Sequence, residues 1–173
     1  MSNIGYVHVY TGNGKGKTTA ALGLALRAAG AGLHVYIGQF VKGMRYSEIK
    51  AFERFKDQVT IQQFGRGCFI HNAPKEEDIA AARQGLDVVR DVITSGNWDV
   101  VVLDEANIAV LFGLFGVDEL LDLIDQKPCG QELVITGRYA DQRLLLRADL
   151  VTEMKEVKHY YAQGVEARVG IER

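Results

Sequence analysis

The chain has 173 residues and a mass of 19.1 kDa, which is the size of one compact domain with a single hydrophobic core. Its 47% hydrophobic and 24% charged residues are typical of a soluble globular protein, and no apolar segment is long enough to cross a bilayer. Because the formal net charge is only −2 and both signs are mixed along the chain, we expect neither a nucleic acid nor a membrane as a partner.

The first expected strand begins after only three residues. A stretch of this length leaves no room for a signal peptide, so we expect a cytoplasmic protein. The two cysteines, Cys68 and Cys129, lie far apart and belong to no CxxC or histidine cluster, so neither a metal–thiolate site nor a disulfide framework is expected. No linker or repeat interrupts the sequence, and residues 1–173 are expected to form a single domain.

Short β-branched runs alternate with longer stretches of helical period. The expected strands are 4–10, 33–40, 58–64, 99–105, 132–138 and 149–154, and the expected helices are 17–29, 47–55, 75–94, 117–125 and 141–148. This alternation predicts βαβ units and a parallel sheet with helices on both faces. The run "VVVL" at 100–103 is apolar at every position, which is typical of a central buried strand. In the first helix, Leu22, Leu24 and Leu26 are expected to face the core.

The first strand leads into the stretch "TGNGKGKTT", residues 11–19. It matches the phosphate-binding pattern G-x-x-x-x-G-K-[ST] at every position except the first, where Thr11 replaces glycine. Glycines let the backbone turn tightly and point successive N–H groups at oxyanions, Lys17 adds a positive charge, and Thr18 offers a hydroxyl suited to Mg²⁺. The residues predicted to bind the phosphates are Gly12, Asn13, Gly14, Lys15, Gly16, Lys17, Thr18 and Thr19.

The irregular stretch 65–74, "GRGCFIHNAP", follows the third expected strand. Long loops in a compact α/β domain are often functional, and this one is placed at the ligand edge of the sheet. Later in the chain the buried run at 100–103 ends in Asp104 and Glu105, an acidic pair suited to hold a metal ion opposite the phosphate loop. The spacing does not decide whether one or both carboxylates touch the metal.

Together these features predict an α/β protein: a three-layer P-loop NTPase fold with a mostly parallel central sheet of the RecA-like kind. The residues alone leave three reaction classes open. They are an ATPase in which Glu105 activates water, a kinase for a small acceptor, and a transferase that uses another part of ATP.

Several longer segments go beyond the generic phosphate loop. They are "VYTGNGKGKTTAALGLALRAAG", "QFVKG", "VVVLDEANIA", "LVITGR" and "ADLVTEMKEVKHYYAQGVEARVGIE". In all of them the chain resembles the P-loop corrinoid adenosyltransferases, which move the 5′-deoxyadenosyl group of ATP to the cobalt of a cobalamin or its precursors. The closing combination of "TGR", "ADLVTEM" and "VKH" is the most selective part. Better-studied relatives have an extra N-terminal helix and Gly-Phe-Thr-Trp after the third strand, where this chain has "GCFI" at 67–70, so it is similar to a shorter branch of the family.

The resemblance implies that Co(I) of a reduced corrinoid attacks the ribose C5′ and that triphosphate leaves. Lys17 and Glu105 would then be catalytic, Thr18, Asp104 and Glu105 would hold Mg²⁺, and no general base is needed. The resemblance further implies ATP in a reversed orientation, a homodimer and a flavoprotein that supplies Co(I).

The remaining candidates follow from their position in the chain. Arg138, in "TGR", is expected to meet the ATP phosphates or a corrinoid amide, with a structural ion pair as the alternative. Phe69 and Ile70 are candidates for the corrinoid face, or else they anchor their loop to the core. His159 is expected to be a structural residue. A regulatory or binding P-loop ATPase without corrinoid activity is the alternative function, and a small-molecule kinase ranks third.

Overall fold

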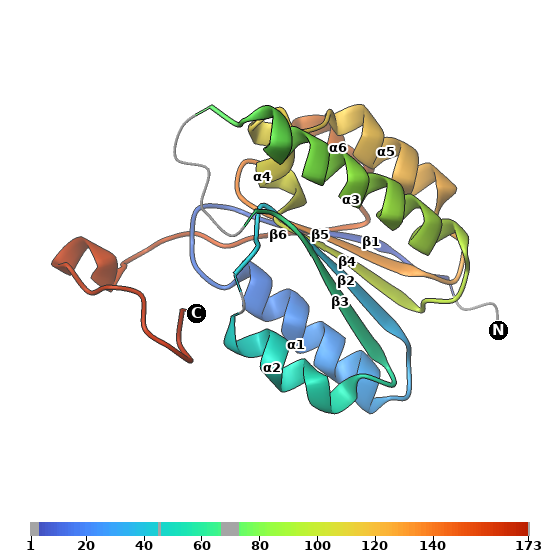
Figure 1. The fold of residues 1–173 in the computed structure, drawn as a ribbon, viewed down its shortest axis with the longest axis horizontal. Helices are drawn as coiled ribbons and strands as arrows, with labels where there is room; N and C mark the ends of the chain where they lie inside the picture. The colour runs from blue at the N-terminus through green and yellow to red at the C-terminus, as the bar shows by residue number, and fades with distance from the viewer. Residues whose placement is uncertain (1–3, 45, 67–72, 173) are drawn as a thin grey trace.

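The computed structural model describes residues 4–44, 46–66 and 73–172 (Figure 1). The strands are β1 (Val7–Thr11), β2 (Val35–Phe40), β3 (Val59–Phe64), β4 (Val100–Asp104), β5 (Glu132–Thr136) and β6 (Leu150–Glu153). The α-helices are α1 (Lys17–Gly30), α2 (Ser47–Phe52), α3 (Glu76–Thr94), α4 (Ala106–Leu111), α5 (Val117–Gln126) and α6 (Gln142–Arg147). Two short 3₁₀ helices, η1 (Glu53–Phe55) and η2 (Tyr160–Gln163), complete the elements.

The six strands form one sheet in the order β3-β2-β4-β5-β1-β6. Every strand pair of the described sheet is parallel, so the predicted mostly parallel sheet is parallel throughout. β4 lies inside the sheet and all five of its residues are buried, which confirms the prediction for the run at 100–103. Because the strands are parallel, the carboxyl ends of all six meet at one edge.

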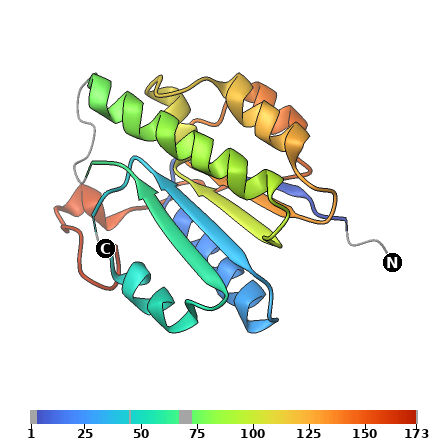
Figure 2. The same cartoon turned by 45° about the vertical axis from the view of Figure 1, so that its right-hand side comes forward.

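Helices cover the sheet on both faces, which gives the predicted three layers (Figure 2). α1 and α2 lie on one face, and α3, α4, α5 and α6 lie on the other (Figure 1). The buried apolar residues form two clusters, one on each face of the sheet. The larger includes Phe40, Leu103 and Leu123, and the smaller joins α1 to residues such as Ile37 and Val102.

The leucine prediction for α1 is wrong in part. Leu26 is 48% exposed, and Leu22 and Leu24 are only half-buried. The helix instead turns its alanines, Ala21, Ala25, Ala28 and Ala29, toward the sheet. Small side chains let a helix pack close to the strands. The side of α1 that carries Leu26 faces away from the sheet.

Two elements were not predicted. The helix α4 follows directly after Glu105, and the short helix η2 lies in the C-terminal part of the chain. All the elements that were predicted are present, with ends that differ by a few residues. Within the described residues, none of the helices combines the length and the apolar character needed to cross a membrane. The single domain expected for residues 1–173 stays a prediction.

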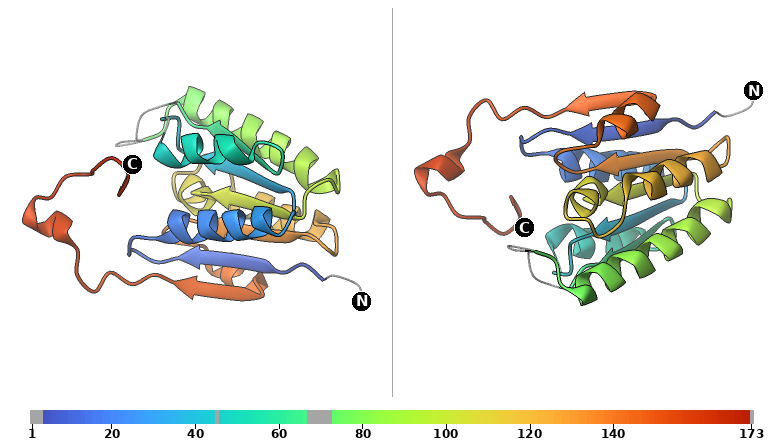
Figure 3. Two further views of the ribbon diagram at one scale, coloured as in Figure 1. Left: turned by 90° about the horizontal axis from the view of Figure 1, so that it is seen from below. Right: turned by 90° about the horizontal axis from the view of Figure 1, so that it is seen from above.

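After β6 the chain leaves the body of the protein. Residues 154–172, here called the C-terminal arm, extend beyond the carboxyl edge of the sheet and curve back toward α1 (Figure 3). The same edge holds every described non-glycine residue with a positive φ: Val41 at 60°, Glu105 at 59° and Tyr139 at 57°. Strained backbone of this kind gathers at functional sites, and these residues follow β2, β4 and β5. The carboxyl edge of the sheet is therefore the candidate location of the functional site.

Candidate functional site

The phosphate loop joins β1 to α1. The backbone turns at Gly12 and Gly16, whose φ angles are 92° and 116°, values that favour glycine. Thr11, the departure from the usual pattern, is the last residue of β1 and does not share this backbone. Its hydroxyl instead accepts a hydrogen bond from the N–H of Ala140 at 3.2 Å. Threonine at position 11 is thus compatible with the loop, because the turn begins one residue later.

Lys17 begins α1 and is only 6% exposed. Its ammonium donates to the carbonyl oxygens of Gly12 at 2.7 Å and Gly14 at 2.6 Å. Burial lowers the pKa of Lys17, the positive charge of Arg138 lowers it further, and Glu105 and Asp104 oppose this shift. No side chain caps the N-terminus of α1, and its first turn has no acidic residue. The helix start can therefore receive an anion.

The loop is held from outside by the C-terminal arm. The N–H of Gly14 donates to the carbonyl of Met154 at 2.6 Å, so this donor, predicted for phosphate, is already used. A Cβ atom at Gly14 would lie 2.7 Å from the Met154 oxygen, and one at Gly12 would lie 2.5 Å from it. These two glycines therefore also permit the close approach of the arm, a role that the sequence pattern did not indicate.

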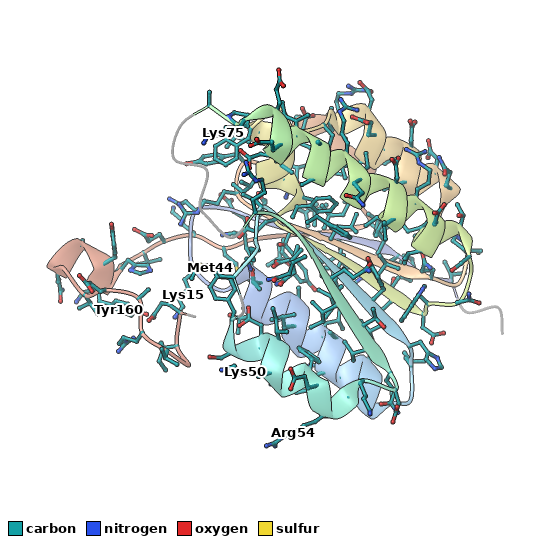
Figure 4. The ribbon with its side chains drawn as sticks, in the orientation of Figure 1. Lys15, Met44, Lys50, Arg54, Lys75 and Tyr160 are labelled. Carbon is teal, nitrogen blue, oxygen red and sulfur yellow. The ribbon has the colours of Figure 1, made fainter. Side chains whose placement is uncertain are left out.

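Lys15 points toward the arm, where it lies close to Tyr160 (Figure 4). Its ammonium donates to the Tyr160 hydroxyl at 3.2 Å, the carbonyl of Ile171 at 3.1 Å and a carboxylate oxygen of Glu172 at 2.9 Å. Hydrogen bonds from Arg168, Lys15 and Tyr160 hold the pKa of Glu172 far below its usual range. Asn13 also meets the arm, since its side-chain oxygen accepts from the N–H of Glu156 at 3.2 Å.

Asp104, at the end of β4, is completely buried and accepts hydrogen bonds from four side chains. The donors are Thr18 at 2.8 Å, Thr136 at 2.7 Å, Gln39 at 3.1 Å and Lys42 at 2.7 Å. They come from α1, β5, β2 and the segment after β2, so this carboxylate joins four parts of the fold. A buried charge of this kind persists only when it is paired and hydrogen-bonded.

Glu105 has a different environment from its neighbour. Its N–H donates to the Thr136 hydroxyl at 3.1 Å, and its left-handed backbone places it at the start of α4 and on the wall of a cavity. Burial raises the pKa of the Glu105 carboxyl, and the negative charge of Asp104 raises it further. Lys42, Lys17 and Arg138 oppose this shift. Asp104 is thus buried and saturated with donors, whereas Glu105 faces the open site.

The oxygen atoms at this edge fit a hard divalent cation. Thr18 and Asp104 lie within hydrogen-bond distance of each other, and Glu105 follows Asp104 directly. The ammonium of Lys42 lies 2.7 Å from Asp104 Oδ2 and 3.2 Å from Thr18 Oγ1, so a cation already fits between these two oxygens. Among the described residues no group of three or more His, Cys, Asp or Glu side chains could hold a metal. A metal here would need phosphate oxygens from its substrate to complete its ligands.

A cavity of about 790 Å³ opens beside the phosphate loop. One end is lined by donors and charges, and the other by apolar side chains of α1, α2 and η1. The charged end holds Gly14, Lys15, Gly16, Lys17, Thr18, Thr19, Lys42, Glu105 and Arg138, and the apolar end holds Leu22, Leu26, Ala51, Phe52 and Phe55. This apolar wall explains why Leu26 is exposed and why Leu22, which also packs against the core, is only half-buried.

The cavity also collects residues that the sequence did not place there. His159, expected to be structural, lines the cavity together with Ile171 and Glu172 of the C-terminal arm. Lys42 stands in the quoted segment "QFVKG", and its signal was a lone charge just after a buried strand. Arg138 lines the cavity as predicted. Phe69 and Ile70 lie outside the described residues, so their expected contact with a corrinoid stays a prediction.

Comparison with known proteins identifies the family. The sequence model of the family described as ATP:corrinoid adenosyltransferase BtuR/CobO/CobP matches residues 3–173. The chain belongs to this family. It is 37% identical over 169 residues to a corrinoid adenosyltransferase of Pseudomonas aeruginosa, a match that covers 97% of this chain and 83% of that protein. It is 36% identical over 169 residues to the corrinoid adenosyltransferase CobA of Salmonella typhimurium, covering 97% and 85% of the two chains.

A corrinoid adenosyltransferase of Escherichia coli gives the same 36% identity and the same coverage. These matches confirm the resemblance drawn from the motifs, and they extend from the phosphate loop to the end of the arm. The membership explains why the chain keeps a P-loop together with its selective C-terminal segment. It does not favour the alternative of a P-loop ATPase without corrinoid activity.

Proposed function

We propose that this protein transfers the 5′-deoxyadenosyl group of ATP to Co(I) of a reduced corrinoid. In this reaction a cobalt–carbon bond forms at C5′, the bond from C5′ to the phosphate oxygen breaks, and triphosphate leaves with the bonding electrons. The two electrons of the new bond come from cobalt, which changes formally from Co(I) to Co(III). No proton has to be removed from the nucleophile, so no general base is required.

The observation that carries this proposal is the cavity beside the phosphate loop, in a chain that matches the family over residues 3–173. Negative charge builds up on the departing triphosphate, and fixed cations and donors stabilise such charge best. Lys17, Arg138 and the start of α1 supply them at one end of the cavity. The apolar side chains of α1 and α2 that line the cavity offer the apolar surface that ligand sites usually have.

Thr18 and Glu105 at the charged end, together with Asp104 beside Thr18, also suit Mg²⁺ and are the proposed ligands. When bound, the ion would neutralise part of the triphosphate charge and fix its orientation. Glu105 would then serve as a metal ligand and would not activate water. A reversed ATP, with C5′ toward the corrinoid, is part of the same proposal.

Further parts of the proposal follow from the resemblance alone. They are a homodimer and a flavoprotein that reduces the corrinoid. A cytoplasmic location is a separate part of the proposal. Phe69 and Ile70 remain the proposed corrinoid contacts.

An anaerobic assay with ATP, Mg²⁺ and chemically reduced corrinoid tests the proposed reaction. We expect alkylated cobalt, followed by its absorption spectrum, and an equal amount of inorganic triphosphate. The phosphate product is informative, because hydrolysis would give ADP and phosphate instead. ADP with unchanged corrinoid would contradict the proposal, and a phosphorylated acceptor would indicate a kinase.

Replacing Glu105 with glutamine is expected to raise the Mg²⁺ concentration needed for half-maximal transfer at least about tenfold, the smaller cost known for losing even an outer partner of a metal site. Glutamine keeps the size of the side chain but removes the charge that faces the cavity. The measurement is the transfer rate against Mg²⁺ concentration. Glu119→Gln, on the far face of the sheet, is the matched control, and an unchanged Mg²⁺ requirement in Glu105→Gln would remove this residue from the metal site.

A further inference from the structure

Lys42 lies between two of the three side chains proposed to hold the metal, Asp104 and Thr18. Its ammonium is 2.7 Å from Asp104 Oδ2 and 3.2 Å from Thr18 Oγ1. Only 16% of the Lys42 side chain and 1% of the Asp104 side chain are exposed, so the ion pair is well shielded from solvent. A lysine carries a positive charge at neutral pH, and the short contact with the Asp104 carboxylate pairs that charge.

The backbone around Lys42 is built to bring it there. The residue before it, Val41, has a φ of 60°, which is rare and costly for a β-branched residue. On the other side, the N–H of Gly65 donates to the Lys42 carbonyl at 3.0 Å. A Cβ at Gly65 would lie 2.6 Å from the Lys42 backbone, so only glycine permits this approach. The strained backbone at Val41 and the close contact with Gly65 both fix the position of the Lys42 backbone, from which the side chain extends.

The cavity offers the Lys42 ammonium a second position. Lys42 lines the cavity, and its Nζ lies 5.7 Å from the centre of the Tyr46 ring, which lines the cavity as well. A lysine has a flexible stem of four carbons and a charge that is not bound to one geometry. A short rotation of that stem can carry the charge from Asp104 into the cavity without moving the backbone.

We propose that Lys42 is a stand-in for the metal. Its ammonium occupies the metal site while no nucleotide is bound, and it moves onto the triphosphate when ATP and the metal bind together. Two cations cannot share the oxygens of Asp104 and Thr18, because their charges repel at such short range. The incoming phosphates supply the negative charge that Lys42 loses when it leaves Asp104. Lys42 then joins Lys17 as a second lysine on the leaving group. This proposal rests on the proposed function, in which the triphosphate occupies the charged end of the cavity.

Two binding measurements on the full chain test the proposal without corrinoid or transfer. The first is Mn²⁺ binding to the nucleotide-free protein, followed by electron paramagnetic resonance. The second is the affinity for inorganic tripolyphosphate in the presence of Mg²⁺, measured by calorimetry. In Lys42→Gln we expect Mn²⁺ to bind more tightly and tripolyphosphate more weakly, each by about 10- to 100-fold, the range of one charge-assisted hydrogen bond.

Two further variants serve as controls. Lys50→Gln removes an exposed lysine of α2 that points away from the protein, and both affinities should stay within about twofold of the wild type, as for other surface changes (Figure 4). Lys42→Arg keeps the charge, so it should still exclude Mn²⁺, even if Lys42→Gln does not fold. Circular dichroism reports whether each variant is folded.

Unchanged Mn²⁺ binding in folded Lys42→Gln would overturn the stand-in role, and unchanged tripolyphosphate binding would overturn the move onto the leaving group. Mn²⁺ binding by Lys42→Arg as tight as by Lys42→Gln would also contradict the proposal, because the charge would then not matter. Neither binding result depends on adenosyl transfer. A failure of this proposal can therefore be told apart from a failure of the proposed reaction.

Discussion

Replacing Lys17 with alanine is expected to lower kcat/KM for adenosyl transfer by about 10²- to 10³-fold, the cost of removing one fixed donor from a developing anion. Lys17 is almost fully buried at the start of α1, beside the place where the triphosphate is proposed to lie. The Lys17 ammonium donates to the carbonyls of Gly12 and Gly14, which a phosphate would replace. The measurement is the anaerobic transfer rate with ATP and reduced corrinoid.

The same variant could lose activity because the loop changes shape. Alanine leaves the two glycine carbonyls without the ammonium, so the folded state must be compared as well. Thermal unfolding of the nucleotide-free variant gives this comparison, and Lys50→Ala controls for the loss of a lysine elsewhere. A transfer rate within about tenfold of the wild type would mean that the Lys17 ammonium lowers the activation free energy by less than about 1.4 kcal/mol. Lys17 would then not stabilise the leaving group.

The phosphate loop and its acidic partner could be predicted because their signals are local. The glycines, Lys17 and Thr18 stand in one short segment after a strand, and Asp104 ends an apolar run. Parallel strands bring such ends to one edge, so the meeting of Thr18 with Asp104 followed from the expected fold. The register of β2, β4 and β5 then decides which polar side chains face that carboxylate.

The contacts of the C-terminal arm could not be predicted in this way. Gly14 meets Met154 and Lys15 meets Glu172 across more than 100 residues of sequence, and neither partner follows from a periodic pattern. The pattern assigned both loop residues to phosphate, whereas the structure shows that the Gly14 N–H and the Lys15 ammonium donate to the arm. Lys42 has the same difficulty, since the strained turn at Val41 and the close contact with Gly65 direct it toward Asp104, and neither can be seen in the sequence. Leu26 of α1 was misplaced because a helical period does not say which apolar face meets the sheet, whereas Leu22 and Leu24 do pack against the core.

Replacing Asp104 with alanine is expected to lower the free energy of unfolding by about 3–5 kcal/mol, the cost of removing one partner from a buried ion pair. The variant leaves the Lys42 ammonium without its carboxylate partner, and it leaves the amide of Gln39 and the hydroxyl of Thr136 without their acceptor. For a chain of this size the midpoint of thermal unfolding should fall by about 6–20 °C. Asp118→Ala, which breaks an exposed pair with Arg143, is the control and should leave the midpoint of thermal unfolding nearly unchanged.

Most of the decrease in the free energy of unfolding of Asp104→Ala should come from the Lys42 ammonium that has lost its partner. A double-mutant cycle can measure this contribution. Lys42→Met on its own leaves a buried carboxylate that still has three neutral donors. The double variant Asp104→Ala with Lys42→Met removes both charges together, so it should be more stable than Asp104→Ala alone. If the two single losses simply add, the pair does not stabilise the nucleotide-free protein. Lys42 would then be free of Asp104 before any metal arrives, and it could not keep the metal's place.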